Sequence, residues 1–241
     1  MLLQQQVEQL TCKLEQQKKE ANEFSYIVSH DLQAPLRMIT GFLDLLNKRF
    51  SDHLDENAQK YIEFAVGGAN KMQQLILDLL EYSRLNTDSN SHELVDLNEL
   101  VAGLATSTSQ ENKDLDIRYT IDELPVVSGN RKQVQRLFRE LIANSITYRR
   151  DDTLHIVIRS KNGNDGWQIS IADNGIGIDP AFADKIFTMF RRLHTNEKIP
   201  GTGAGLAICR KIADLHEWKI WTEHRNEPGA VICLLLPKSD K

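Results

Sequence analysis

The sequence predicts an α + α/β fold, a helical hairpin followed by an α/β sandwich, on two observations. Up to about residue 85, apolar residues recur at alternating spacings of three and four, which is the period of one helix face. After residue 92 they alternate with polar residues in short runs bounded by glycine, asparagine and aspartate, which is typical of strands. We expect one mixed sheet covered on one face by helices.

The length of 241 residues allows two domains, and 41% apolar with 26% charged residues is typical of a soluble globular protein. The net charge of −5 argues against nucleic acid as a ligand, because nucleic-acid domains carry a basic surface. Three cysteines without metal-ligand spacing indicate neither a disulfide framework nor a zinc site, and they favour a reducing, cytoplasmic location. No apolar run approaches the roughly 20 residues of a membrane span.

The first part of the chain carries a heptad pattern, which runs over residues 3–50 and returns over residues 61–82. We predict a coiled-coil signalling helix over residues 1–20 that leads into an antiparallel helical hairpin over residues 21–87. Two helices bury little on their own, so a pair of hairpins would form a four-helix bundle in a homodimer. The alternative for the first helix is a single amphipathic helix lying on its own domain.

The second part begins after a polar linker, assigned to residues 88–95, and the sandwich domain covers residues 96–241. We expect its elements in this order: a helix over 96–110, a strand over 116–121, a helix capped by Asn130 and ending near 148, strands over 154–159 and 167–172, a short helix containing Phe187 and Phe190, a helix over 204–216, and strands over 219–222 and 230–236.

One histidine stands beside an acid and shortly before a proline, as His30, Asp31 and Pro35. Proline inside a helix costs about 3 kcal/mol, because it removes an amide donor and its ring presses on the carbonyl four residues back. Here that carbonyl belongs to Asp31. We interpret the weakened helix and the imidazole as one device, although His30 by itself would be read as an exposed helix histidine.

Three clusters in the second domain are candidates for binding a phosphorylated ligand. Residues 173–177, Asp-Asn-Gly-Ile-Gly, follow a predicted strand, although the same pattern is a common turn. Residues 201–205 open a helix, where backbone amides favour phosphate, although such glycines are also common in flexible loops. Glu140 and Asn144 lie one helical turn apart and could hold a hydrated Mg²⁺ ion, although such a pair is more often a solvated helix face.

In this order the motifs resemble those of the catalytic core of sensor histidine kinases of two-component signalling. His30 lies in a sequence similar to the H box, and the N box, first glycine box, F box and second glycine box are matched at residues 140–144, 173–177, 187–190 and 201–205. The run Ser-His-Asp-Leu-Gln-Ala-Pro-Leu-Arg is most similar to the phytochrome-type branch. The resemblance implies a dimerisation and phosphotransfer hairpin followed by an ATP-binding domain of the gyrase, chaperone and histidine kinase type.

The resemblance also implies a homodimeric kinase that phosphorylates His30 with ATP and Mg²⁺ and passes the phosphoryl group to an aspartate of a response regulator. Asp31 would orient the imidazole, Asn144 would bind Mg²⁺, and Glu140 would support its waters or assist proton transfer. Asp173 would accept a hydrogen bond from the adenine amino group. We expect the sensor domain to lie upstream, outside this chain. The other implied nucleotide contacts are Tyr148, Gly175, Gly177, Phe190, Arg191, Arg192, Lys198, Gly201, Thr202, Gly203, Gly205 and Leu206.

The predicted ATP-binding domain departs from the family pattern at two places, and the helical hairpin departs from it at Ala34. Thr147 stands where these kinases often have a phosphate-contacting lysine, so Arg149, Arg150 or a residue of the lid between Phe190 and Gly201 would have to supply that charge. The sequence His-Glu-Trp at residues 216–218 replaces the usual His-Gly-Gly and leaves the local turn unpredicted.

Two other functions remain open at this point. A gyrase- or chaperone-like ATPase would use nucleotide to drive a conformational change without modifying a histidine. A scaffold would dimerise, bind partners and sense ATP without catalysis. The helical part that carries His30 argues against the ATPase, whereas Thr147 keeps the scaffold open.

Ala34 predicts weak phosphatase activity. Kinases of this family that also remove phosphate from their partner carry a threonine or asparagine four residues after the histidine, where it orients a water molecule. A methyl group has no hydrogen-bonding atom with which to do this. We expect little ADP-independent loss of phosphate from a phosphorylated partner regulator, and brisk dephosphorylation by the wild-type protein would contradict this prediction.

Overall fold

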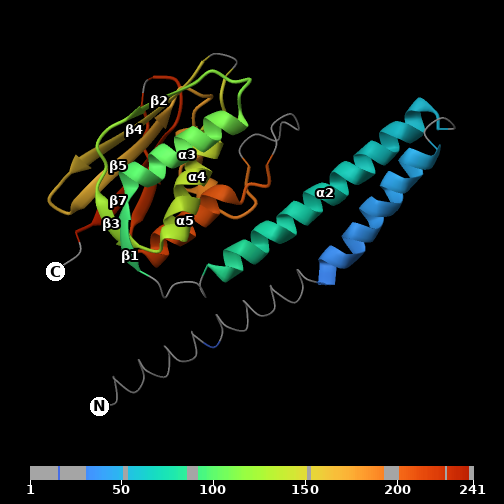
Figure 1. Cartoon of the computed structure of the whole chain (residues 1–241), viewed down its shortest axis with the longest axis horizontal. Helices are drawn as coiled ribbons and strands as arrows, with labels where there is room; N and C mark the ends of the chain where they lie inside the picture. The colour runs from blue at the N-terminus through green and yellow to red at the C-terminus, as the bar shows by residue number, and fades with distance from the viewer. Residues whose placement is uncertain are drawn as a thin grey trace. The chain divides into compact units, whose positions relative to one another are not determined.

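The structure is a computed structural model that describes residues 16, 31–50, 54–85, 92–150, 153–192, 201–225 and 227–238 (Figure 1). Internal contacts divide the chain into two compact units, Met1–Arg84 and Leu85–Lys241. Several predictions fall outside the described residues, namely the coiled-coil helix apart from residue 16, His30 and Lys198. Among the helices that are described, none combines the length and the apolarity needed to cross a membrane.

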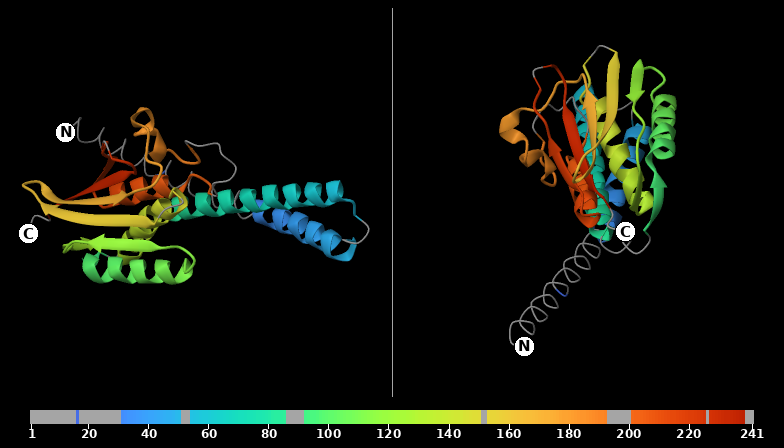
Figure 2. Two further views of the ribbon diagram at one scale, coloured as in Figure 1. Left: turned by 90° about the horizontal axis from the view of Figure 1, so that it is seen from above. Right: turned by 90° about the vertical axis from the view of Figure 1, so that its left-hand side faces the viewer.

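The first unit contains the predicted pair of helices. Residues 31–50 are helical, and α2 spans Glu56–Arg84. Asp55 stabilises the start of α2, because its carboxylate accepts a hydrogen bond from the backbone N–H three residues later at 2.6 Å. The two helices are antiparallel (Figure 2). They share a small buried core of Leu36, Ala69 and Ile76.

This unit also has a large exposed apolar surface. The buried side chains of α2 include the seven-residue repeat Ile62, Ala69 and Ile76. The heptad pattern identified in the sequence begins one residue earlier, at Tyr61, and 71% of the Tyr61 surface is exposed. Since successive helix positions differ by about 100°, the helix has two adjacent apolar columns, of which only one is buried. The exposed large apolar residues are Leu32, Met38, Ile39, Phe42, Leu45, Leu46, Phe50, Tyr61, Phe64, Met72 and Leu77.

The second unit is built on a mixed five-stranded sheet with the order β2-β4-β5-β7-β6. β2 (Ile117–Ile121) pairs in parallel with β4 (Leu154–Asn162). Antiparallel pairs then join β4 to β5 (Gly166–Asp173), β5 to β7 (Val231–Pro237) and β7 to β6 (Lys219–Thr222). Alternate residues of β4 are almost fully buried, so one face of the sheet carries the core; these are Leu154, Ile156 and Ile158.

Helices α3 (Leu97–Glu111), α4 (Arg131–Thr147) and α5 (Gly205–Leu215) cover that face (Figures 1 and 2). The predicted cap of α4 forms, because the Asn130 side chain accepts hydrogen bonds from the backbone N–H groups of Lys132 and Gln133 at 3.1 and 3.2 Å. Asp96 caps α3 in the same way. The predicted sandwich, one sheet covered on one face by helices, is confirmed.

Two short strands were not predicted. β1 (Glu93–Asp96) pairs antiparallel with β3 (Val126–Gly129) in a separate two-stranded sheet. Residues 93–95 therefore form a strand, although we assigned them to the linker. Each strand has four residues, the shortest length over which an alternating pattern can be recognised.

The F-box segment is also different from the prediction. The expected short helix is two 3₁₀ turns, η2 (Pro180–Phe182) and η3 (Lys185–Phe187), and Phe190 follows them with a φ of 60°. Glu217 is the other non-glycine residue with positive φ in the described parts of the chain, at 58°. It occupies the first of the two positions at which the family usually has glycine, the residue that adopts this conformation without steric cost.

The turn at residues 216–218 connects the end of α5 to the start of α4 through two hydrogen bonds of His216. Nδ1 of His216 donates to the carbonyl of Ile212 at 2.8 Å, and Nε2 accepts from the backbone N–H of Asn130 at 3.0 Å, which requires the neutral ring. Burial lowers the pKa of His216. The hydrogen bond to Ile212 opposes that shift, and His92, whose ring centroid lies 5.6 Å away, adds to it.

We expect the second unit to lose stability as the pH falls through about 6.5, partly because of His216. Its pKa is lower in the folded state than in the unfolded state, where the reference value is about 6.5, so the unfolded state binds more protons below that pH. The stabilisation is complete above the unfolded pKa and is lost as the pH falls from that value through the lower folded pKa. Urea unfolding midpoints measured from about pH 5.5 to about pH 8 report the slope of stability against pH.

In this experiment His216→Gln should flatten the slope, because glutamine does not titrate. His155→Gln, at an exposed position of β4, is the control and should keep the wild-type slope. Identical slopes for wild type and His216→Gln would show that another group is responsible.

Candidate functional site

The described residues of the second unit surround a cavity of about 220 Å³ between α4, the turn after β5, residues 191–192 and the start of α5. Gly175 and Phe190 do not line it, Asp31 belongs to the first unit, and His30 and Lys198 are not described. The predicted site residues that line the cavity are Glu140, Asn144, Tyr148, Asp173, Gly177, Arg191, Arg192, Gly201, Thr202, Gly203, Gly205 and Leu206.

One wall of the cavity is the face of α4 that carries Glu140, Asn144 and Tyr148, three residues spaced four apart. Oε1 of Glu140 forms an ion pair with Arg136 at 2.8 Å, one turn earlier on the same helix. A Cβ atom added to Gly205 would overlap Oε2 of Glu140. Glycine at this position therefore allows α5 to begin directly against the Glu140 carboxylate.

Asn144 is the residue best suited to a metal ion. Its side-chain nitrogen is buried and has no hydrogen-bond partner among the described residues. An amide can be turned over with no change of shape, so the same position can present an oxygen to a cation. Within the described ranges no group of three or more His, Cys, Asp and Glu side chains could hold a metal. The residues present thus fit an Mg²⁺ ion that takes most of its ligands from phosphate and water.

Asp173, at the end of β5, is held by hydrogen bonds on almost every side. Its Oδ1 accepts from the backbone N–H groups of Gly175 at 2.8 Å and Ala230 at 3.1 Å. Its Oδ2 accepts from the Ser145 hydroxyl at 3.1 Å. Its carbonyl accepts from the guanidinium of Arg225, which reaches across from the loop between β6 and β7. The carboxylate meets only donors, so toward the cavity it offers an acceptor.

The glycine at position 175 lets the turn after β5 lie against the end of α4. The carbonyl of Tyr148 accepts a hydrogen bond from the N–H of Ile176 at 3.0 Å, and a Cβ atom on Gly175 would overlap that same carbonyl oxygen. Gly177 has a φ of 84°, in the left-handed region. The two predicted glycines therefore shape the turn in different ways, one by close approach and one by conformation.

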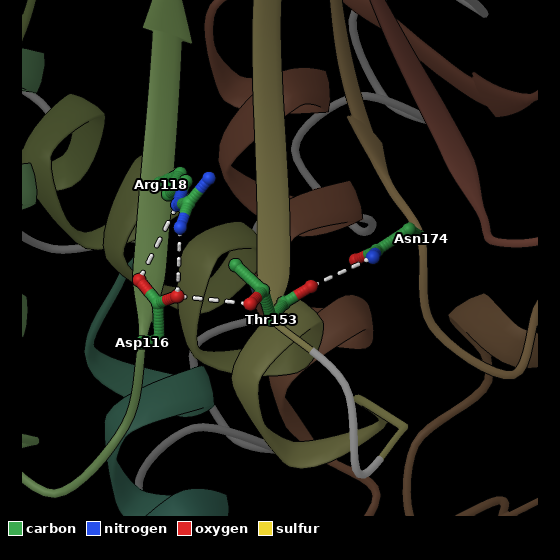
Figure 3. Close-up of polar contacts among 4 residues, drawn as sticks. All are labelled: Asp116, Arg118, Thr153 and Asn174. Atoms are coloured by element: carbon green, nitrogen blue, oxygen red, sulfur yellow. Dashed lines mark hydrogen bonds and ion pairs between the residues drawn. The ribbon is translucent and has the colours of Figure 1, made fainter.

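Asn174 connects this turn to the sheet (Figure 3). Its side-chain nitrogen donates to the carbonyl of Thr153 at 2.8 Å, and its oxygen accepts from the N–H of His155 at 2.9 Å. The Thr153 hydroxyl donates to Asp116 at 2.8 Å, and Asp116 also pairs with Arg118 at 3.1 Å. Thr153, and to a smaller extent Arg118, lower the pKa of the Asp116 carboxyl. The turn is thereby joined to the first residues of β2 and β4.

The opposite wall is formed by the glycine-bearing loop at residues 201–204 and the start of α5. Gly203 has a φ of 79°, and a Cβ atom there would lie 2.8 Å from the carbonyl oxygen of Arg191. No side chain caps the first turn of α5, so its N–H groups remain available at the cavity, which Gly205 and Leu206 line. Below this wall the Arg210 guanidinium lies 4.4 Å from the ring centroid of Phe187, which attaches the F-box segment to α5.

Sequence reasoning missed part of the cavity lining. Ser145 and the apolar wall of Ile171, Ile178, Ile186 and Ile232 were not identified, because isolated apolar residues indicate core as readily as a ligand pocket. For Ser145, the signal available in the sequence was a hydroxyl directly after Asn144. Among the cations offered in place of a lysine at Thr147, Arg191 and Arg192 line the cavity, whereas Arg149 and Arg150 do not.

Family comparisons match two segments of the chain. Residues 20–88 match the family described as "His Kinase A (phospho-acceptor) domain". Residues 129–240 match the family described as "Histidine kinase-, DNA gyrase B-, and HSP90-like ATPase". The first segment contains His30, and the second contains the cavity residues of α4, β5 and α5.

Individual relatives agree with these matches. The chain is 39% identical over 229 residues to "Cyanobacterial phytochrome A" of Nostoc sp., covering 95% of this chain and 30% of that protein. It is 36% identical over 233 residues to "Phytochrome-like protein Cph1" of Synechocystis sp., covering 97% and 31%. The chain thus spans about a third of the length of these relatives. The structure of histidine kinase ThkA in complex with response regulator protein TrrA is similar with a TM-score of 0.60 and 26% identity, covering 90% of this chain and 61% of that chain.

We expect Gly175→Ala to damage the cavity, because the added methyl would push the turn away from Tyr148 and break its bond to Ile176. Overpacking of this kind costs about 1–3 kcal/mol. Gly103→Ala on α3 is the control, since nothing lies within 4 Å of the added atom, and it should be neutral or stabilising by up to about 1 kcal/mol. Thermal or urea unfolding measures both, and equal stability of the two variants would contradict the close approach at Gly175.

Proposed function

Since this chain belongs to the histidine kinases, with a phospho-acceptor domain ahead of the ATPase domain, we propose that it is the catalytic core of a sensor kinase that phosphorylates its own His30 with ATP. The phosphoryl group then passes to an aspartate of a response regulator. The observation that carries the proposal is the cavity, where three predicted motifs distant in sequence, at residues 140–144, 173–177 and 201–205, meet within one unit. The match of residues 20–88 to a phospho-acceptor domain supports His30 as the acceptor.

The base of ATP would bind at the inner end of the cavity. Asp173 offers an acceptor there, as the amino group of adenine requires, and apolar side chains line the space around it. The triphosphate would extend toward the start of α5. The uncapped N–H groups of the first turn of α5, together with Thr202, Arg191 and Arg192, are suited to phosphate oxygens.

In the reaction a neutral ring nitrogen of His30 donates its lone pair to the γ-phosphorus, while the bond to the oxygen that bridges the β- and γ-phosphates breaks and ADP leaves. Asp31 accepts a hydrogen bond from the other ring nitrogen and fixes the tautomer. Bound Mg²⁺ would neutralise charge on the phosphate oxygens, with Asn144 as its protein ligand and Glu140 near its waters. The proton released from the imidazole passes to a nearby carboxylate or to water.

We propose that the chain works as a homodimer. The two helices of the first unit bury only a small core, while a row of large apolar side chains on both helices remains exposed. A second hairpin would cover that surface in a four-helix bundle. Both substrates of the proposed reaction, ATP and the regulator, are found in the cytoplasm, so we assign the reaction to that compartment.

We expect incubation with γ-labelled ATP and Mg²⁺ to produce a label that is stable to alkali and labile to acid. His30→Gln should abolish it, because the acceptor nitrogen is lost. Asn144→Asp should reduce its rate at least about tenfold, which corresponds to about 1.4 kcal/mol of transition-state stabilisation. His155→Gln is the control and should label normally.

The same assay separates the competing functions. Steady hydrolysis of ATP without label on the protein would favour a gyrase- or chaperone-like ATPase. Binding of ATP without label or hydrolysis would favour a scaffold. A label that survives His30→Gln would contradict the proposed acceptor.

A further inference from the structure

The hydrogen bonds around Asp173 leave one atom for a ligand. Both acceptor positions of Oδ1 are occupied by backbone N–H groups, those of Gly175 and Ala230. Oδ2 has one protein partner, the hydroxyl of Ser145 at 3.1 Å. A carboxylate oxygen accepts two hydrogen bonds, so Oδ2 retains one acceptor position at the cavity.

Ser145 is built into the site rather than placed on the surface. It follows Asn144 on α4, lines the cavity, and is 4% exposed. Its hydroxyl has a second possible acceptor, the carbonyl of Leu141 at 3.4 Å, a longer and therefore weaker contact than the one to Asp173 at 3.1 Å. The shorter contact assigns the proton to Asp173 and fixes the rotation of the carboxylate.

We propose that Ser145 is a positioning residue that makes the cavity selective for a purine with a 6-amino group over one with a 6-oxo group. The proposal rests on the proposed binding of ATP at this site. With its other acceptor positions filled by donors, Asp173 can receive the amino hydrogen of adenine at one defined point. A 6-oxo group would place lone pairs against those of Oδ2 and would leave the half-buried carboxylate with an unmet acceptor.

A purely structural role for Ser145 predicts something different. A serine that bonds only to a carbonyl four residues back affects its helix, and its loss would change the affinity for every nucleotide alike. In contrast, if Ser145 orients the Asp173 carboxylate that accepts from the base, its loss changes the affinity for the 6-amino purine alone. The ratio of the two affinities therefore distinguishes the roles.

The test measures binding of ATP and of inosine triphosphate, which differ at the 6-position, by calorimetry with Mg²⁺. All forms carry His30→Gln so that nucleotide is not consumed. We expect Ser145→Ala to raise the Kd for ATP about fivefold, the effect of losing one net hydrogen bond, and to leave the Kd for inosine triphosphate unchanged. Ser107→Ala is the matched control, because Ser107 also bonds a helix carbonyl, that of Leu104 at 3.0 Å, but lies on α3 outside the cavity.

The outcomes separate this inference from the proposed function. Equal changes for both nucleotides in Ser145→Ala, or no change, overturn the role of Ser145 while ATP binding stands. A His30→Gln protein that binds neither nucleotide overturns both. If Ser145→Ala does not fold, Ser145→Cys keeps the volume and a weak donor, and the ratio of affinities should then fall by a smaller factor. An unchanged ratio in that variant overturns the inference.

Discussion

The position of α4 is fixed by hydrogen bonds at both of its ends, and the geometry of the cavity depends on it. At the start, the N–H of Asn130 donates to His216, just beyond the end of α5. At the other end, the carbonyl of Tyr148 accepts from Ile176 in the turn after β5. Hydrogen bonds weaken steeply with distance and angle, so α4 has little freedom to slide against either neighbour. The separation between Asn144 and Asp173 is fixed as a result.

The sequence was sufficient for features that arise from neighbouring residues. The period of the apolar pattern located the long helices, Asn130 marked the start of α4, and the glycine clusters marked the turns around the cavity. Features that join distant residues could not be recognised in this way. The hydroxyl of Ser145 and the guanidinium of Arg225 meet Asp173 from 28 and 52 residues away, and only the folded sheet brings them together.

The first unit shows a different limit of sequence reasoning. A heptad pattern identifies an apolar stripe, but α2 carries two such stripes side by side, and neighbours such as Tyr61 and Ile62 belong to different ones. The energy of burial does not depend on direction, so the pattern alone does not say which stripe meets the neighbouring helix and which is left exposed. Small rotations of α2 about its axis would exchange surface between the two.

The ion pair between Arg136 and Glu140 divides the cavity into two electrostatic regions. On α4, the guanidinium cancels the charge of the carboxylate within a partly buried pair, which dissolved salt screens weakly. On the opposite wall, Arg191 is exposed and its field reaches the solvent. If Arg191 contacts phosphate as we propose, ionic strength would act on that side of the cavity more than on the helix side, and so on the strength of nucleotide binding more than on its position.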